Sequence, residues 1–378
     1  MSAIRPRDLL TGAVLGQLHG ADLAEASGDA TPGAVGDDEA TRAGIARDFS
    51  VLREAGYLAV ALPGEFGGLG CTLRQAACGQ RRLAGVAPLT ALAVSTHLYW
   101  TGAAADAYRS GDESVSWILD EAARGAIFAA GHGLPGLDLK FSAPDSRCEL
   151  VASGNYELSD GGVLSSLTPE YDWVAVHALA SFPASAPGEA RPAGEPAAGG
   201  RVARREAILG FAPPGTRRIP AHRVARVLPA GAPSDVFTAS AVGWGCAVLA
   251  SVEFSAARRA FRRACDLAAI ASDGSGTVPL PREPKVAERP PDPGPRSPLD
   301  QWPVAEASLR LDAMKARIAD VTHPWPRIPE PGPDLGGQHL ISVYAMRHEV
   351  TEGSARVRAL AARIASSRSG SDSAIPAR

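Results

Sequence analysis

The spacing of apolar residues along the chain changes twice. From about residue 38 to 125, apolar residues recur every three or four positions, with Gly and Pro between the segments, which is typical of helices. Further along, stretches such as DWVAVHALAS alternate apolar and polar residues, which predicts strands. After about residue 239 the helical spacing returns. This order, with helices before and after the strands, argues against alternating β-α-β units.

These patterns predict particular elements. Helices are expected over 39–60, 87–107, 112–124, 249–270, 304–320 and 338–366. Strands are expected in VASGNYELSD, DWVAVHALAS and AILGFA. Proline-rich stretches at 184–200, 277–303 and 323–333 are expected to lie outside regular elements.

The last predicted helix keeps a heptad pattern, which is typical of the seam of an antiparallel helix bundle. The heptad positions are Val343, Met346, Val350, Gly353, Val357, Leu360 and Ile364. Together the patterns predict an α+β fold with an N-terminal helical domain, a small β-barrel-like domain and a C-terminal bundle. The expected boundaries are 1–125, 126–235 and 236–366, followed by a disordered tail at 367–378.

Composition and charge narrow the function classes. A net charge of −3 gives no sign of a nucleic-acid partner. The five cysteines are widely spaced and form no C-x-x-C pair, which predicts reduced thiols in a cytoplasmic protein. The eight histidines show no metal-ligand spacing, so no metal site is expected. The uncharged run 236–252 contains Ser, Thr and Gly, and we interpret it as a buried helix and not a membrane span.

A basic stripe lies on the predicted helix 249–270. Arg258, Arg259, Arg262 and Arg263 share one face, opposite an apolar face, and Asp266 stands four residues after Arg262, the spacing of an attractive pair. Such a stripe could meet an anionic phosphate. The more common interpretation is a solvated face, or one that pairs with an acidic helix.

A helix that runs into a glycine-rich loop gives the first resemblance to a known family. In LREAGYLAVALPGEFGGLG, Pro63, Gly67, Gly68 and Gly70 match a P-x-x-x-G-G-x-G loop. This stretch resembles the N-terminal domain of the acyl-CoA dehydrogenase family, where the loop lies near the flavin and the acyl pocket. The resemblance therefore implies that Gly67 and Gly68 line the substrate pocket.

Two further stretches are similar to flavin-supporting segments of that family. FAAGHGLPGLD resembles F-C-x-T-E-P-G-x-G-S-D, with Phe128, Gly136 and Asp138 at matching positions. NYELSDGGVLSSLTPEYDW keeps the spacing of a second motif up to Asp172 and Trp173. The resemblance implies flavin contacts from Phe128, Ala130, Gly131, Gly136, Leu164, Ser165 and Ser166. It also implies a substrate-pocket position for His132, which replaces a glutamate.

The resemblance has consequences beyond the site. It implies a C-terminal four-helix bundle, FAD as the cofactor with FMN as a possibility, and an acyl-CoA or related thioester as the substrate. It also implies a homo-oligomer.

The chain also departs from the family pattern. Gly131 and Leu137 replace a Thr and a Ser that support the flavin, Leu164 replaces a Trp, and Gly162 replaces a Lys. The R-x-x-F-G segment and the terminal loop with a catalytic glutamate are not recognisable. Glu253, Glu349 and Glu352 are available acids outside any base motif, so no catalytic base is predicted.

Three hypotheses follow. The preferred one is an acyl-CoA dehydrogenase-like flavoprotein that oxidises an acyl thioester at its α,β carbons and transfers hydride to FAD. The second is a two-component flavin-dependent monooxygenase on the same fold, which would not need the catalytic glutamate. The third is a degenerate, non-catalytic member that acts as a scaffold or hetero-oligomer partner.

Overall fold

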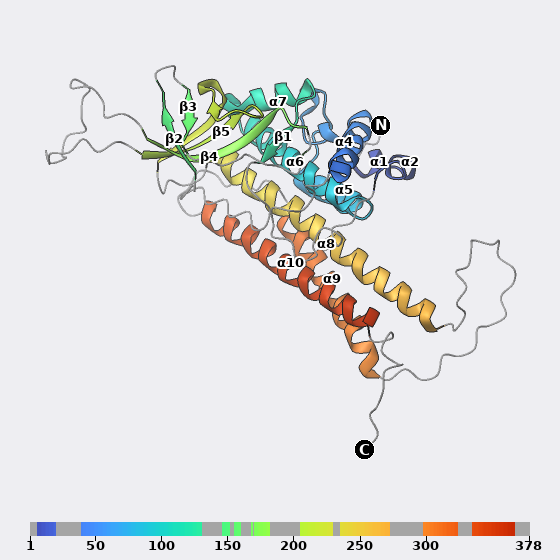
Figure 1. Ribbon diagram of the computed structural model, residues 1–378. Coiled ribbons are helices and arrows are strands. Elements are labelled where there is room, and N and C mark those ends of the chain that lie inside the picture. Colours follow the sequence, from blue (N-terminus) through green and yellow to red (C-terminus); the bar gives the residue numbers. More distant parts are fainter. Residues whose placement is uncertain are drawn as a thin grey trace, which may run out of the picture.

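The computed structural model describes most of the chain in ten segments. These are residues 6–19, 39–130, 146–151, 155–159, 168, 170–181, 205–229, 235–272, 298–323 and 335–366. Figure 1 shows helices at the N-terminal side, a sheet beside them and long helices that extend away from both. The predicted α+β order of helices, a barrel-like sheet and a C-terminal helix bundle is confirmed.

The N-terminal part is helical. Its α-helices are α1 (Pro6–Leu9), α2 (Gly12–Leu15), α4 (Glu39–Glu54), α5 (Leu73–Ala84), α6 (Pro88–Arg109) and α7 (Ser116–Ala123). Short 3-10 turns occur at η1 (Tyr57–Ala59), η2 (Gly64–Phe66) and η3 (Glu113–Val115). The helix predicted over 39–60 ends earlier, because Gly56 takes a φ of 75° and turns the chain.

Helix α6 is the centre of this part. Its residues from Pro88 to Ala107 are buried nearly all round, which is typical of a core helix. Helix α5 beside it begins with a capping box, in which Thr72 and Gln75 satisfy each other's backbone N–H groups. The buried carboxylate of Asp48 on α4 accepts hydrogen bonds from the Thr90 hydroxyl on α6 and from the backbone N–H of His19. These contacts hold the first segment on α6.

The seven strands form one sheet. They are β1 (Phe128–Ala130), β2 (Ser146–Leu150), β3 (Tyr156–Leu158), β4 (Trp173–Ser181), β5 (Arg205–Ala212), β6 (Arg218–Ile219) and β7 (Val224–Pro229). The order is β6-β3-β2-β4-β5-β7, and β1 also pairs with β4. Strand β5 occupies one edge of β4, so β1 and β2 share the other edge, where both run parallel to β4.

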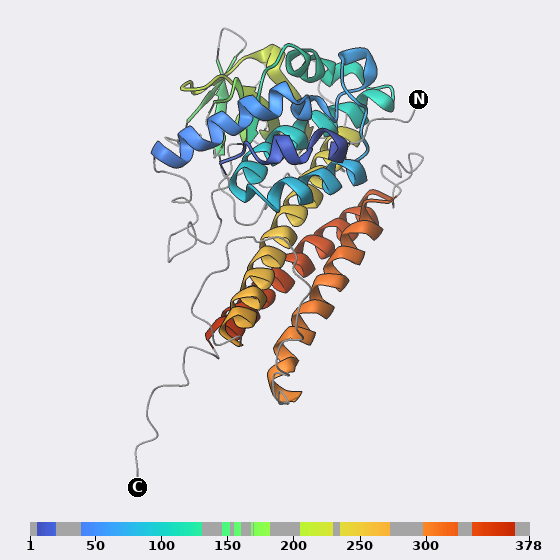
Figure 2. The same cartoon turned by 90° about the vertical axis from the view of Figure 1, so that its right-hand side faces the viewer.

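Three long helices form the C-terminal part of the described chain. They are α8 (Val236–Ser272), α9 (Pro298–Val321) and α10 (Leu335–Ser366). All seven heptad positions of α10 are buried, as predicted. The resemblance implied a four-helix bundle, whereas the described residues contain three bundle helices. Figure 2 shows α10 beside both α8 and α9.

Helix α8 connects the two helical parts. It packs against α5 and α6 at one side and against α10 at the other (Figure 1). Its stretch from Val236 to Leu267 is long and apolar enough to cross a membrane by length and composition, but most of that stretch is buried inside the protein. The indole N–H of Trp244 on α8 donates to the buried carboxylate of Asp106 on α6 at 2.7 Å. This hydrogen bond fixes the two helices side by side.

Candidate functional site

The face of the sheet that meets α6 carries the predicted flavin contacts of β1. Phe128 and Ala130 stand two residues apart on β1, so their side chains point to the same face. Phe128 pairs with Trp173, Ala130 pairs with Ala175, and Ala175 pairs in turn with Phe211 on β5. Phe128, Ala175 and Phe211 belong to the same buried cluster as α6 and α8. We call this face, formed by these five residues, the sheet–helix face.

Hydroxyl groups attach both predicted flavin segments to α6. The Thr96 hydroxyl lies 3.4 Å from the carbonyl oxygen of Phe128 and 3.2 Å from the Thr168 hydroxyl. The Thr168 hydroxyl also donates to the carbonyl of Ala93 at 3.2 Å. Thr168 follows the predicted flavin residues Ser165 and Ser166 closely in the chain. One turn of α6 therefore positions the end of that segment beside β1.

A buried histidine on α6 holds the start of β1. The Nδ1 atom of His97 accepts a hydrogen bond from the Phe128 N–H at 3.3 Å, and Nε2 lies 2.9 Å from the carbonyl oxygen of Leu58. Nε2 must carry the proton, because a carbonyl oxygen can only accept. Burial lowers the pKa of His97 to about 4, so the ring is neutral near pH 7. His97 is thus a positioning residue for β1.

An aromatic cluster closes one end of the sheet–helix face. Trp117 on α7 contacts Phe128, Trp173 and Phe211, with ring centroids between 5.4 and 6.2 Å apart. The guanidinium of Arg223 lies 4.6 Å from the ring centroids of both Trp117 and Trp173. Such cation–π contacts add to the apolar packing and fix the rings.

Two aromatic residues of α6 carry buried donors for which the described segments provide no partner. Tyr99 and Trp100 stack with ring centroids 3.9 Å apart, and Trp100 also contacts Phe211 edge-on at 5.1 Å. Both side chains are buried, yet the Tyr99 hydroxyl and Trp100 Nε1 have no hydrogen-bond partner among the described residues. Burial raises the pKa of Tyr99 well above its ordinary value, so the hydroxyl keeps its proton. The Trp100 donor lies beside the sheet–helix face, and the Tyr99 donor lies towards Cys246 and Tyr344, so each could meet an acceptor oxygen of a ligand.

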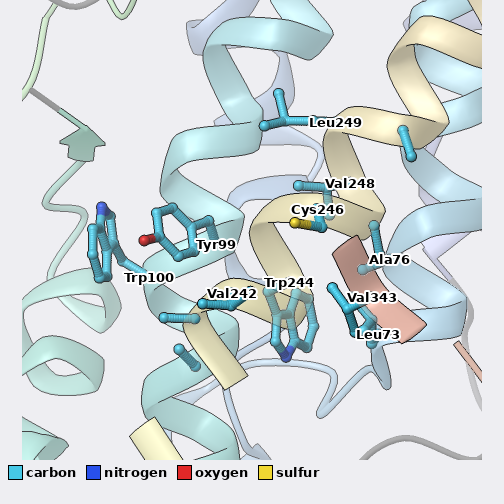
Figure 3. Packing of buried hydrophobic residues seen from close by; sticks show 14 of the residues in the cluster. Leu73, Ala76, Tyr99, Trp100, Val242, Trp244, Cys246, Val248, Leu249 and Val343 are labelled. Atoms are coloured by element: carbon cyan, nitrogen blue, oxygen red, sulfur yellow. The ribbon is translucent and has the colours of Figure 1, made fainter. Parts of the chain in front are cut away.

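Cys246 lies on the α8 side of this pair. Figure 3 shows Tyr99 and Trp100 together on α6, with Cys246 and Trp244 on the helix that faces them. Burial raises the pKa of the Cys246 thiol to about 12, so it remains protonated near pH 7 and is a poor nucleophile. This thiol contributes packing to the interface.

The predicted pocket glycines both have local reasons to be glycine. Gly67 takes a φ of 78° at the end of η2. At Gly68, a Cβ atom would stand 2.1 Å from the carbonyl oxygen of Leu62. Phe66, the residue just before these glycines, packs edge-on against Tyr108 of α6, with ring centroids 5.2 Å apart. The loop is therefore fixed against α6, and its role in a substrate pocket stays a prediction.

Six of the predicted site residues lie outside the described residues. They are Gly131, His132, Gly136, Leu164, Ser165 and Ser166. Their contacts with a flavin or a substrate stay predictions.

Sequence reasoning did not single out Thr96, His97, Tyr99 or Trp100. The stretch STHLYW (95–100) carries a signal, because it places polar and aromatic residues inside an otherwise apolar helix. Polar groups in a core helix need a partner or a function.

Two of the three acids considered as a base are engaged in ion pairs. Glu253 pairs with Arg347 at 2.5 Å and accepts from the Thr351 hydroxyl, and Glu349 pairs with Arg317 at 3.1 Å. Glu352 is exposed. Within the described segments, no group of three or more His, Cys, Asp or Glu residues could hold a metal ion.

Comparisons with known proteins rest on structure alone. No protein-family model matches the chain, and no curated protein does so. A nitrososynthase from Micromonospora carbonacea var. africana superposes with a TM-score of 0.65 at 18% identity, over 96% of this chain and 86% of that one. Nitroalkane oxidase superposes with a TM-score of 0.60 at 11% identity, over 95% of this chain and 85% of that one.

A third similar structure is dibenzothiophene monooxygenase (TdsC) from Paenibacillus sp. A11-2. It superposes with a TM-score of 0.57 at 15% identity, over 86% of this chain and 81% of that one. The same monooxygenase is also solved in complex with FMN and indole. At these identities the similarity shows the fold. The chain therefore has an acyl-CoA dehydrogenase-like fold, with a helical N-terminal part, a barrel-like sheet and a C-terminal helix bundle.

Proposed function

We propose that this chain is a flavin-dependent monooxygenase or oxidase of a small organic substrate, and that it does not dehydrogenate acyl thioesters. The main support is that the buried carboxylates of the described residues already have bonding partners. Among the described residues the buried acids are Asp48, Asp106 and Glu206. Asp48 bonds to Thr90, Asp106 bonds to Trp244 and Arg109, and Glu206 also has a partner.

The engagement of these carboxylates argues against a reaction that needs a free carboxylate base. Removal of a proton from the carbon α to a thioester needs a carboxylate base beside that carbon, with a pKa matched to the task. The described part of the chain offers no unengaged buried carboxylate for that role. A monooxygenase draws its oxidising power from reduced flavin and oxygen, and so does not need such a base.

The packing of α6 against α8 also argues against a long acyl substrate between these helices. Trp244 fills the space over Gly102, where an added Cβ would stand 2.2 Å from Trp244 Cδ2. The two helices are in direct contact along this stretch. Side chains fill this interface, so an extended acyl chain has no space between these two helices.

The residues near β1 fit a flavin. An isoalloxazine needs flat apolar walls and a few aimed donors. Ala130 and Ala175 provide a small, flat surface, and Phe211 and Trp100 provide aromatic walls. Tyr99 and Trp100 add two buried donors without partners in the described chain. We infer that these residues hold the ring system, and that the bound flavin supplies the redox chemistry.

The first experiment is a visible absorption spectrum of the purified protein after incubation with FMN or FAD and gel filtration. Flavin bands that elute with the protein would support the proposal. Anaerobic addition of acyl-CoA should then leave the bands unchanged, whereas bleaching would support the dehydrogenase instead. A protein that retains neither flavin would contradict both enzyme hypotheses and favour a non-catalytic scaffold.

A second measurement separates a monooxygenase from a dehydrogenase without knowledge of the substrate. Pre-reduced FMN is mixed with aerated buffer, with and without a stoichiometric amount of protein. For a monooxygenase we expect the protein to change the rate of flavin reoxidation. An unchanged rate in the presence of bound flavin would count against this proposal.

A further inference from the structure

A cluster of arginines lies where α5 ends beside α8. Arg81 and Arg82 are in the last turn of α5, and Arg258 and Arg262 are one turn apart on α8. The two helices pack against each other, and the Ser255 hydroxyl donates to the Arg81 carbonyl at 2.9 Å. That hydrogen bond places Arg81 next to the turn of α8 that carries Arg258. We call these four residues the arginine cluster.

The cluster has a surplus of positive charge. Arg262 makes no ion pair with Asp266, although the four-residue spacing allowed one, and Arg81, Arg82 and Arg258 likewise have no acidic partner among the described residues. Burial, with added repulsion from Arg262 and Arg81, lowers the pKa of Arg258. Arg258 is therefore within electrostatic range of Arg262 and Arg81. An unneutralised cluster of this kind costs free energy unless an anion joins it.

Capping of α5 does not explain the cluster. Cations near a helix C-terminus stabilise the helix dipole, which accounts for Arg81 and Arg82. The final carbonyls, however, already have partners, because the Ser255 hydroxyl and the Gly85 N–H donate to Arg81 O, and the N–H groups of Val86 and Ala87 donate to Leu83 O. Arg258 and Arg262 are thus not required by the end of α5.

The chemistry of the cluster favours phosphate as the ligand. All of its cations are arginines, and the planar guanidinium fork binds phosphate oxygens in pairs, which an ammonium group cannot do. The cluster combines one turn of α8, about 6 Å long, with the end of α5, which packs about 8–10 Å away, and this span matches a short phosphate chain. The net charge of −3 disfavours a long polyanion such as nucleic acid.

We propose that the arginine cluster binds the diphosphate or triphosphate group of a small soluble molecule. The site is separate from the sheet–helix face, because Arg258 stands fourteen residues after Trp244 on α8, or about 21 Å along the helix. It is also independent of the proposed flavin chemistry. Protein without flavin should bind the phosphate chain equally well.

The test is isothermal titration calorimetry of the full-length protein with inorganic pyrophosphate at low ionic strength. We expect saturable binding to the unmodified protein, and an affinity reduced about tenfold for each guanidinium that is removed. The double variant R258A/R262A should therefore bind about a hundredfold more weakly. The variant R258K should also weaken binding, because it keeps the charge but loses the fork.

A matched control removes the same charge elsewhere. Arg47 on α4 and Arg218 on β6 are exposed, and R47A/R218A changes the net charge equally. This control should bind pyrophosphate as the unmodified protein does. Circular dichroism of all variants confirms that they are folded.

Several outcomes would overturn the proposal. These are no binding of pyrophosphate, equal loss in the control and cluster variants, or equal affinity for citrate, which would indicate unspecific attraction of anions. Binding to vesicles that contain phosphatidylserine, with none to free pyrophosphate, would assign the cluster to a membrane surface and contradict a small soluble ligand.

Discussion

Trp244 on α8 lies directly over Gly102 on α6. A Cβ atom at position 102 would stand 2.2 Å from Trp244 Cδ2, closer than non-bonded atoms can approach. The indole cannot easily move away, because its N–H is bonded to Asp106 at 2.7 Å. The glycine is therefore required by packing between the two helices.

We expect Gly102→Ala to lower the free energy of unfolding by about 2 kcal/mol, a typical cost of overpacking a core. Urea denaturation followed by circular dichroism measures this change. Gly245→Ala on α8 is the matched control, because its Cβ would lie 3.5 Å from Tyr99 Cδ2, an ordinary contact. The control should be neutral or stabilising, since alanine favours helix. Equal losses in both variants would contradict the packing argument.

His97 predicts a dependence of stability on pH. Its pKa falls from 6.5 in the unfolded chain to about 4 in the folded protein. The folded state binds this proton less readily than the unfolded chain does. The contribution of neutral His97 to the free energy of unfolding is therefore complete above pH 6.5 and is lost as the pH falls towards 4. This pKa shift corresponds to about 3 kcal/mol in the free energy of unfolding.

The pH effect can be isolated by comparing His97→Gln with the unmodified protein in urea titrations between pH 7 and pH 4. The variant should be less stable at pH 7, and its stability should fall less steeply with acid. His348→Gln, at an exposed position on α10, is the control and should follow the unmodified protein. Parallel curves for His97→Gln and the unmodified protein would contradict this assignment.

Tyr99 allows a separation of stability from ligand binding. Its buried hydroxyl has no partner in the described chain, so Tyr99→Phe should leave the free energy of unfolding unchanged or raise it by up to about 1 kcal/mol. If the hydroxyl meets the flavin or substrate, the same variant should retain less flavin or turn over substrate more slowly.

Tyr57→Phe is the matched control for that experiment. Its buried hydroxyl donates to Gln80 at 3.3 Å, so its removal should cost about 1 kcal/mol and leave flavin retention unchanged. A Tyr99→Phe protein that loses stability like the control, with no change in ligand binding, would assign Tyr99 a purely structural role.

Arg226 on β7 joins the sheet to both helical parts. It forms ion pairs with Asp112 before η3 and with Asp235 before α8, and its Nη1 donates to the Ser114 hydroxyl at 2.9 Å. We expect Arg226→Met to lower the free energy of unfolding by about 2 kcal/mol, since it leaves two carboxylates unpaired in a partly buried place. Thermal unfolding followed by circular dichroism measures this.

The control for Arg226 is Arg310→Met, which breaks an exposed pair with Glu306 within one helix. Such surface pairs contribute little, so the melting temperature should hardly change. A similar drop in both variants would show that Arg226 acts as one more surface charge and does not join the parts of the fold.

Local patterns were sufficient to predict the long elements. The heptad of α10 places Val343 and Ile364 in the bundle core, and the alternation in β4 marks a strand correctly although both of its faces are buried. Strand β2 and the short strands β6 and β7 did not stand out. Their positions depend on pairing with distant residues, as when Tyr156 pairs with Ile219, and such pairing leaves little trace in a local window.

The site was less predictable than the fold. Resemblance located Phe128 and Ala130 on the face that meets α6, but it did not indicate which side chains of α6 stand opposite them. In the sequence, Tyr99 and Trp100 look like ordinary core aromatic residues. That their donors have no partner in the described segments can be recognised only when the packing around them is known. Whether a buried polar side chain has a hydrogen-bond partner depends on the packing of the whole folded chain.

The shared edge of β4 has a consequence for the order of events during synthesis. Strands β1 and β2 both pair with β4, which follows them in the chain, so β1 cannot pair with it until residue 175 has left the ribosome, and β2 cannot until residue 181 has done so. Until then the nascent chain carries two strands with unpaired backbone groups, a state that favours aggregation. Cotranslational helpers would have the most effect on this protein while its first 180 or so residues are exposed.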